Sequence, residues 1–331
     1  MTAHLPNTSR RAVVARRRAL ALLSGALLAG VLAACGGAGS PSAASLVHAT
    51  FTSHKPIESG RIDLTFALTP TGSAGSPTAA GPVRLGLQGP FESLGPARLP
   101  RFALALTLTS AGHTLPAGAT STSGQLYIEL AGAYFTAPAA TVSALAQGYA
   151  QATRASSSSA ASQSTFAALG VNPGEWLVHP HIVGTVDTAG AQTTHVTGEL
   201  DVTRFLADAD KLAGAGGALG LGAGGGSGLS LLSPAGIRAL AGSVRSAHVD
   251  LYTGSHDHLL RRLSISASIS STAQTRAALG GLGSANLQLT LQFAGLNQPQ
   301  AIAAPSNPQP ISKLLPALER LGLALGAGAA S

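Results

Sequence analysis

The residue of this sequence best suited to covalent chemistry is its single cysteine. Cys35 is the only cysteine among 331 residues, and it directly follows Leu32-Ala33-Ala34. A cysteine thiolate is a nucleophile, and small residues in front of it fit the peptidase that acts on the bacterial lipobox. In that motif the thiol receives diacylglycerol and the cysteine then becomes the new N-terminus. We therefore predict that Cys35 is lipidated. The alternative is a plain signal peptide with an incidental free cysteine.

The segment before Cys35 has the layout of an export signal. Five arginines lie within residues 10–18, and residues 19–34 carry no charge. A basic start, a short apolar run and small residues at its end are typical of a signal peptide. The run is shorter than the roughly 20 residues of a membrane span. We predict a lipoprotein signal peptide over residues 1–34. Ser9-Arg10-Arg11 also permits twin-arginine export, so the export route stays open.

Lipidation would determine where the protein resides. The thioether-linked and amide-linked acyl chains on Cys35 together give an attachment that a single chain cannot sustain. This predicts a protein anchored to the outer face of the cytoplasmic membrane, in a bacterial cell envelope. Residues 35–45 are small and polar, which is typical of a flexible tether. The sequence identifies no protein partner.

Histidine supplies the other candidate chemistry. His179-Pro180-His181 and His256-Asp257-His258 could each present two imidazoles to one metal ion. A complete site needs three or four ligands, and neither pair has a neighbouring acid or cysteine beyond Asp257. We therefore expect exposed turn and junction positions, with no metal and no cofactor. Asp208 and Asp210, two residues apart, cannot share a helix face, and we expect both to be solvated.

No pattern in the chain predicts catalysis. A G-x-S-x-G elbow is absent, and Gly220-x-Gly222-x-x-Gly225 lies in a glycine tract without the preceding strand that a dinucleotide site requires. We expect no catalytic residues, and so a protein that is not an enzyme. Five of the 20 Lys and Arg residues lie in the signal, which leaves an excess of two over the 13 acidic residues. Without a basic run, nucleic-acid binding is not expected.

Period-two alternation predicts antiparallel strands along most of the remaining chain. It is clearest in "RIDLTFAL" (61–68), "RFALALTLT" (101–109), "GQLYIEL" (124–130) and "NLQLTLQFAGLN" (286–297). Two hairpins are also predicted, one with Ala189-Gly190 at its turn and one around residues 254–257. Segments 69–82 and 110–121 have the composition of turns. We expect eight to eleven strands in all.

Helical spacing interrupts this pattern in four places. Helices are predicted over residues 138–154, over 202–214 with Asp201 as cap, over 233–246 with Ser233 as cap, and from about Ile311. A serine tract and a short helical piece ending at Gly170 follow the first of these. The glycine-rich segment 213–230 is predicted to be a mobile loop, because each glycine costs about 1 kcal/mol against alanine in a helix.

Four stretches resemble the LolA/LppX-LprG-like superfamily of envelope lipoprotein and lipid carriers. "GQLYIELAGAYF" resembles its strand-turn-strand before the first helix, and "AGAQTTHVTGELDV" the strand pair before the second. "VDLYTGSHDHLLRRLSIS" is similar to the closing hairpin, and "LNQPQAIAAP" to the last strand and its exit. The chain departs from the family where Tyr134-Phe135 and Tyr252 stand in place of a frequent tryptophan. The resemblance covers roughly residues 45–312.

The resemblance implies an α+β fold. A strongly curved antiparallel sheet, an incomplete β-barrel, would have helices covering its concave face. The domain would span residues 46–312, followed by a C-terminal helix and tail over 313–331. It also implies a cavity between sheet and helices that accepts acyl-chain lipid or another hydrophobic ligand. Candidate cavity residues are Leu64, Phe66, Leu104, Leu106, Leu126, Ile128, Leu145, Tyr149, Trp176, Leu251, Leu263 and Ile265.

Two interpretations of these residues remain open. Tyr149, Phe166 and Trp176 either line a ligand pocket or fill the core under the helices. Aromatic residues make up only 4% of the chain, and short aliphatic side chains under glycine-interrupted helices would fill a curved sheet poorly. This favours an apolar cavity, with the 213–230 loop as a candidate gate. The alternative is a non-catalytic structural or partner-binding envelope lipoprotein without a ligand cavity.

Overall fold

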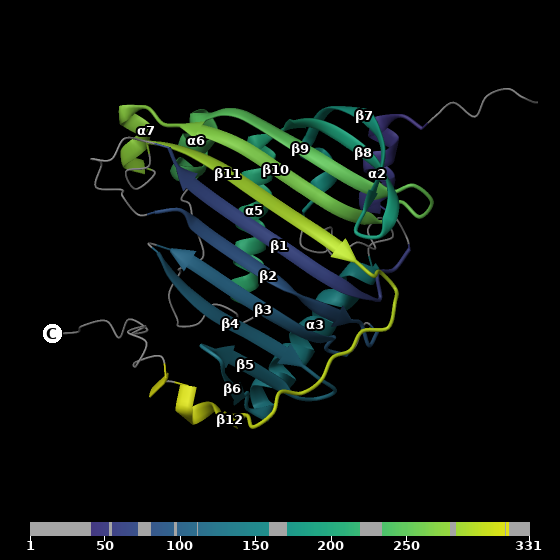
Figure 1. Ribbon diagram of the computed structural model, residues 1–331, viewed down its shortest axis with the longest axis vertical. Coiled ribbons are helices and arrows are strands. Elements are labelled where there is room, and N and C mark those ends of the chain that lie inside the picture. The colour runs from purple at the N-terminus through teal and green to yellow at the C-terminus, as the bar shows by residue number, and fades with distance from the viewer. Residues whose placement is uncertain are drawn as a thin grey trace, which may run out of the picture. The chain divides into compact units, whose positions relative to one another are not determined.

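The alternating segments of the sequence form one sheet of twelve strands (Figure 1). Its order is β12-β6-β5-β4-β3-β2-β1-β11-β10-β9-β8-β7, antiparallel throughout except where β12 runs parallel to β6. The strands are β1 (Ser59–Pro70), β2 (Val83–Glu92), β3 (Arg101–Ser110), β4 (His113–Ser121), β5 (Leu126–Leu130), β6 (Ala133–Thr136), β7 (Leu177–Thr188), β8 (Ala191–Leu200), β9 (Val244–Gly254), β10 (Leu260–Ser270), β11 (Ser284–Ala294) and β12 (Gln309–Pro310).

The computed structural model describes residues 41–52, 55–71, 81–95, 98–110, 112–158, 171–218, 234–278, 283–314 and 316–317. Residues 1–41 and 42–331 form separate units, and the features below belong to the second. Several predicted features lie outside the described residues. They are the signal peptide, Cys35 and most of its tether, the helical piece before Gly170 with Phe166, Ser233, residues 219–230 of the glycine-rich segment, and the tail beyond residue 317.

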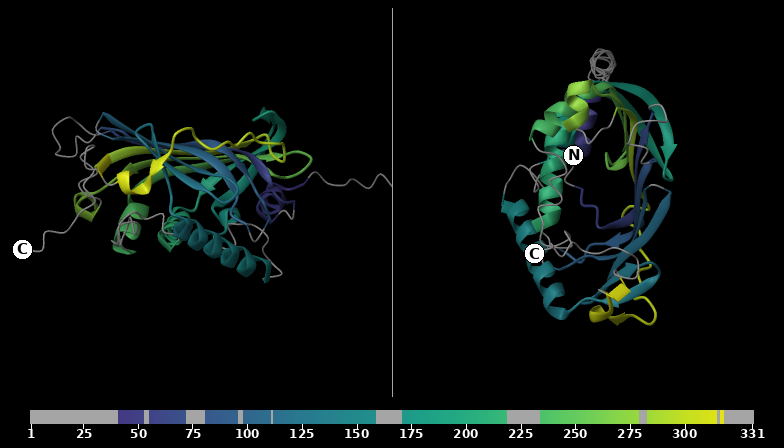
Figure 2. Two further views of the ribbon diagram at one scale, coloured as in Figure 1. Left: turned by 90° about the horizontal axis from the view of Figure 1, so that it is seen from below. Right: turned by 90° about the vertical axis from the view of Figure 1, so that its left-hand side faces the viewer.

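The helices lie on one side of this sheet, which curves around them (Figure 2). Among the described residues they are α2 (Ala43–Thr52), α3 (Ala139–Ser158), α5 (Val202–Ala218), α6 (Pro234–Ser243) and α7 (Ala273–Ala278), with short 3-10 helices η1 (Pro173–Glu175) and η2 (Ile311–Lys313). The predicted α+β class, a curved and unclosed antiparallel sheet with helices on one face, is confirmed. No helix of the described part combines the length and apolar character of a membrane span.

Local signals account for most element boundaries. The predicted hairpin turn at Ala189-Gly190 joins β7 to β8, and both residues have positive φ angles, of 54° and 77°. Glycine adopts such angles at little cost. Asp201 caps α5 as predicted, because its Oδ1 accepts a hydrogen bond of 3.0 Å from the backbone N–H of Arg204.

Four sequence-based boundaries were wrong. Segment 110–121 is not a turn: residues 113–121 form β4, which pairs with β3 along its length. The predicted tether 35–45 overlaps α2, which begins at Ala43 and buries Leu46 and Val47. The third predicted helix ends at Ser243, because β9 begins at the next residue. Residues 213–218 of the predicted loop continue α5, so a helical end was taken for loop from its glycines alone.

Gly89 marks an irregularity in the centre of the sheet. The pairing between β2 and β3 is interrupted at Gly89 and Pro90, while the register is the same on both sides, at Gln88↔Ala105 and Phe91↔Phe102. Gly89 has a φ of +150°, and an added Cβ would lie 1.9 Å from the carbonyl oxygen of Ala103. Glycine within a strand often marks a bend or a close approach of another backbone segment. We infer that Gly89 helps the sheet to curve.

Replacing Gly89 tests this inference. Gly89→Ala should destabilise the fold by about 2–3 kcal/mol, because a methyl group must displace backbone atoms or strain its own φ. Gly86→Ala is the matched control in the same strand, where a Cβ meets nothing within 4 Å. Thermal unfolding followed by circular dichroism should show a clearly lower midpoint for the first variant only. Equal midpoints would contradict a role for Gly89.

Candidate functional site

Rows of apolar side chains cross the sheet from strand to strand. Directly paired residues of antiparallel strands place their side chains on the same face. In one row Leu291 of β11 pairs with Leu64 of β1, which pairs with Leu87 of β2. We call this face, shared with the buried core, the inner face. The two rows are Val196–Leu251–Leu263–Leu291–Leu64–Leu87–Leu106–Ala117–Leu130 and Val249–Ile265–Leu289–Phe66–Leu85–Leu108–Leu115.

The first row is buried at both ends, and the second row at its β9–β10 end. At the β8–β10 end, Leu251 is fully buried and Leu263 is 4% exposed, in a core with Leu46, Val47 and Phe51 of α2. At the other end of the first row Leu130 is 8% exposed, and Phe135 of the neighbouring strand β6 is 1% exposed. The second row ends at Leu115, which is only half-buried.

The middle of both rows is only half-buried. Leu64 and Phe66 of β1, Leu87 of β2 and Leu106 of β3 all keep intermediate exposure, and Leu108 is 37% exposed. The inner positions of these central strands carry mainly leucine, with isoleucine, valine and phenylalanine, while Arg61, Asp63 and Arg84 occupy the alternate, exposed positions. The central inner face is therefore an uncharged apolar surface that the chain buries incompletely.

The structure divides the predicted cavity residues into two groups. Trp176, Leu251, Leu263 and Ile265 belong to the packed core, as the alternative interpretation of Trp176 had it. Leu126 is also buried. The remaining residues are half-buried, in β1, β3, β5 and α3. They are Leu64, Phe66, Leu104, Leu106, Ile128, Leu145 and Tyr149.

Sequence reasoning missed Leu87 and Leu85, which lie in the middle of both rows. They belong to β2, which was not recognised as a strand because Gly86, Gly89 and Pro90 weaken its pattern. Their signal was alternation over residues 83–87, where valine and leucine recur at every second position. Ala117 and Leu115 were missed with β4 for the same reason, since prolines and glycines within a strand resemble a turn.

A buried carboxylate holds α5 against the core. Asp208 is 8% exposed, and its oxygens accept hydrogen bonds from Trp176 Nε1 at 3.0 Å and from Lys211 Nζ at 2.7 Å. The backbone N–H of Asn172 donates a third at 3.2 Å. Phe205, on the same helix, packs edge-on against the Trp176 ring. The prediction that Asp208 is solvated was wrong, because i, i+2 spacing shows only that two residues cannot share a face, not which of them is buried.

These contacts determine the protonation of Asp208. Burial by itself raises the pKa of the carboxyl group, but the hydrogen bonds from Lys211, Trp176 and Asn172 together outweigh it and hold the pKa below its ordinary value. A carboxylate with a lowered pKa stabilises the folded chain above the pKa of its unfolded form, and this contribution is lost as the pH falls through the folded value. We call the arrangement of Trp176 and Asp208 the α5 clamp.

The outer face of the sheet carries paired polar side chains. His195 Nε2 lies 2.8 Å from Asp250 Oδ1, and the His195 ring stacks on Tyr252. Arg262, on the same face, lies over the Tyr252 ring with its Cζ 5.4 Å from the ring centre, and it donates to Gln292 at 2.6 and 2.9 Å. Burial raises the pKa of Tyr252, with a further increase from Asp250. These side chains therefore make hydrogen bonds and ring contacts with one another across strands β8 to β11.

The His256-Asp257-His258 segment closes a hairpin. Asp257 accepts a hydrogen bond from the backbone N–H of Leu259 at 3.0 Å and pairs with Arg261 at 2.6 Å. Although burial raises its pKa, these bonds lower it below the ordinary value overall. Asp257 is thus engaged in the turn between β9 and β10. Among the residues that the structure describes, no three His, Cys, Asp or Glu side chains gather as metal ligands would.

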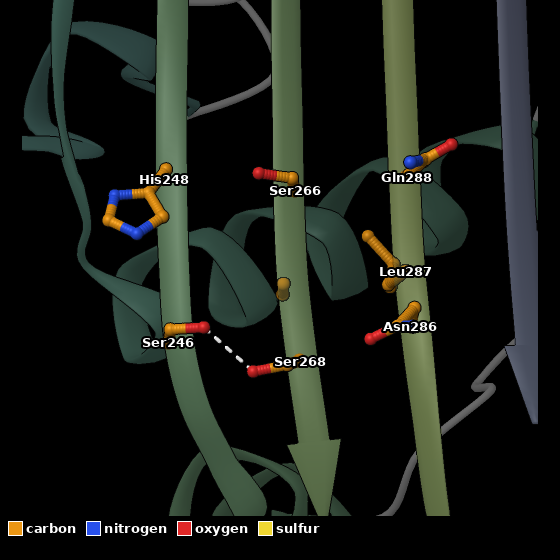
Figure 3. Close-up of a pocket in the computed structure, with 8 residues that line it drawn as sticks. Ser246, His248, Ser266, Ser268, Asn286, Leu287 and Gln288 are labelled. Atoms are coloured by element: carbon orange, nitrogen blue, oxygen red, sulfur yellow. Dashed lines mark hydrogen bonds between the residues drawn. The ribbon is translucent and has the colours of Figure 1, made fainter. Parts of the chain in front are cut away.

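Two pockets lie away from the central inner face. One, of about 220 Å³, is a hollow on the outer face of β9–β11, where the small side chain of Ser266 lies between His248 and Gln288 (Figure 3). The other, of about 370 Å³, lies between α2 and the start of β7, with Val47, Phe51 and Leu177 in its wall. Neither includes a predicted cavity residue.

Solved structures with a similar chain path include LprF, the lipoprotein LppX and a putative lipoprotein-sorting domain. LprF from Mycobacterium bovis is 12% identical with a TM-score of 0.37, covering 81% of this chain and 99% of its own. The Mycobacterium tuberculosis lipoprotein LppX is 13% identical with a TM-score of 0.31, covering 79% and 98%. A putative outer membrane lipoprotein-sorting protein domain from Vibrio parahaemolyticus is 6% identical with a TM-score of 0.19, covering 77% and 93%. No family model and no curated protein sequence matches the chain.

Removing the charge of Asp208 should loosen the α5 clamp. Asp208→Asn weakens hydrogen bonds to a charged group, so we expect a loss of about 1.5–3 kcal/mol at pH 7. Trp176 is the only tryptophan, so its fluorescence reports on this site directly. The wild-type chain should lose part of its stability below about pH 4, and the variant should lack that part. Asp210→Asn, at an exposed position of the same helix, is the control; an equal loss in both variants would contradict the clamp.

Proposed function

We propose that this protein is an envelope lipoprotein, anchored through Cys35, that binds an acyl-chain lipid or another hydrophobic ligand against the inner face of its sheet. The observation that supports this most directly is the burial pattern of the two apolar rows. The first row is buried at both ends and the second at its β9–β10 end, and both rows are half-buried on β11, β1 and β2.

The chemistry of the inner face suits an apolar ligand. Apolar surface gains about 25 cal/mol for each Å² removed from water, so a half-buried row of leucines gains from any apolar group placed against it. The neighbouring charges, such as Arg61 and Asp63, point to the other face. A bound acyl chain would therefore meet aliphatic and aromatic carbon along its length, and a polar headgroup would remain outside the rows.

The absence of a charge along the rows also bears on mechanism. Binding requires no proton transfer or covalent step; the sheet only replaces water around the ligand. Selection would be weak, because rows of leucine and phenylalanine discriminate poorly between hydrocarbon chains of similar width. We infer a carrier or holder of hydrophobic molecules and not a catalyst.

Filling the inner face tests ligand binding. Ala119 of β4 pairs with Leu104 and Ile128, so its side chain lies on the inner face. Ala119→Phe should occupy space that a ligand would use, and it should reduce the affinity for a fluorescent fatty acid about tenfold or more. Thr107→Phe, at an exposed position of β3, is the control with the same added bulk on the outer face.

The stability of the Ala119→Phe variant separates the two functions. If the inner face borders space for a ligand, the melting temperature should change little. If the core is filled, overpacking should destabilise the fold by about 1–3 kcal/mol. A strongly destabilised variant, together with no fatty acid binding by the wild-type chain, would instead support a structural or partner-binding lipoprotein.

The anchor is tested separately. Cys35→Ser removes the thiol that would form the thioether, so the precursor should keep its full mass and fail to incorporate a radiolabelled fatty acid. The wild-type chain should incorporate the label and lose the mass of residues 1–34. Labelling of the serine variant would overturn the assignment of Cys35.

A further inference from the structure

Exposed apolar side chains gather on one strand of this protein. Among the described residues, the large apolar side chains that remain exposed are Leu108 and three residues of β7. Ile182 is 41%, Val183 58% and Val186 45% exposed. We call these three residues the β7 patch. From His181 to Val186 the strand has no Asp, Glu, Lys or Arg, so the patch is an uncharged surface.

The patch lies at an edge of the sheet. β7 is the last strand in the order, and within the described chain it pairs with β8 alone. A free apolar edge usually attracts another strand or another surface. Its backbone geometry distinguishes between these two kinds of partner.

β7 is poorly shaped for pairing with a further strand. Its register is broken twice, between Val178 and His181 and between Ile182 and Gly184, and Pro180 has no N–H to donate. The second break also changes which face its side chains occupy. Ile182 lies opposite Val196 of the inner face, whereas Val186 lies beyond the break, on the same side as His195 of the outer face. The apolar groups therefore flank the edge on both sides, as a wedge would, instead of forming one flat face.

The short distance in sequence between Cys35 and α2, which packs against β7, indicates which surface the β7 patch would contact. α2 packs against β7 and η1, with Val47 and Phe51 of α2 beside Leu177 and Pro180. Cys35 precedes Ala43, the first residue of α2, by eight residues. Even fully extended, eight residues reach only about 29 Å. An anchor at Cys35 would therefore keep the β7 side of the domain close to the membrane.

We propose that the β7 patch inserts into the surface of the phospholipid bilayer to which Cys35 is anchored. The proposal rests on the anchorage proposed above and not on the ligand-binding inner face. Insertion would remove Ile182, Val183 and Val186 from water and would fix the orientation of the domain, which a flexible tether alone leaves free. Because no charge takes part, the attraction is apolar and should respond little to salt.

The test uses a chain that starts at residue 36, which carries no lipid and contains the whole compact unit of residues 42–331. Its partition onto phosphatidylcholine vesicles is measured by flotation. Combined replacement of Ile182, Val183 and Val186 by serine should lower the partition coefficient about fivefold or more. Thr185→Leu, which adds an apolar group to β7, should raise it. Thr107→Leu, at an exposed position of β3, should leave it unchanged.

Three outcomes would overturn the proposal. One is unchanged partition of the triple variant when its Trp176 fluorescence shows a native fold. Another is binding that disappears at about 1 M salt, which would assign it to charges. The third is a wild-type dimer that the triple variant abolishes, which would make a second copy the occupant of β7. Since this chain has no lipid, a failure of the Cys35 anchor shows only in the labelling experiment above and is distinguishable from a failure of the patch.

Discussion

In-register pairing of leucine-rich strands is the constraint on which the structure depends. Because β11, β1, β2 and β3 pair residue for residue, Leu291, Leu64, Leu87 and Leu106 fall into one row. A slip of one residue in any pair would turn that strand's apolar set to water. The alternation that forms the sheet therefore also creates the continuous apolar face that a ligand could use.

Curvature then decides how much of that face the chain can bury by itself. Helix α2 and the α5 clamp close the β8–β10 end around Trp176, Val196 and Leu251. Short side chains on the central strands do not fill the curve to the same extent, and Leu64, Phe66 and Leu106 remain half-buried. The packed end thus holds the fold, and the central strands keep apolar surface that the described chain buries only in part.

The sequence predicted those elements whose signal is local. β1, β3 and β11 were recognised from strict alternation, and the two hairpins from turn residues such as Ala189 and Gly190. It failed for β2 and β4, since glycine and proline within those strands resemble the composition of a turn. Gly89 is an example, because its role depends on the Ala103 carbonyl of a neighbouring strand.

The sequence predicted which face of the sheet the candidate residues occupy, but not how deeply each side chain is buried. Alternation identifies Leu64 and Leu263 equally as inward, yet one is half-buried and the other 4% exposed. The difference arises from α2, a helix that the sequence analysis assigned in part to a tether. Likewise, burial of Asp208 depends on Trp176, 32 residues away in the chain. Distances between elements that pack together cannot be obtained from periodicity.

Native mass spectrometry of the protein purified from its own membranes would detect a bound lipid directly. Gentle activation keeps a hydrophobic ligand bound, while a covalent lipid on Cys35 would add a constant mass. If the inner face binds an acyl-chain lipid, the spectrum should contain a further, non-covalent mass increment that dissociates at higher collision energy. A spectrum that contains only the mature chain with its covalent modification, from preparations with a native fold, would contradict such binding.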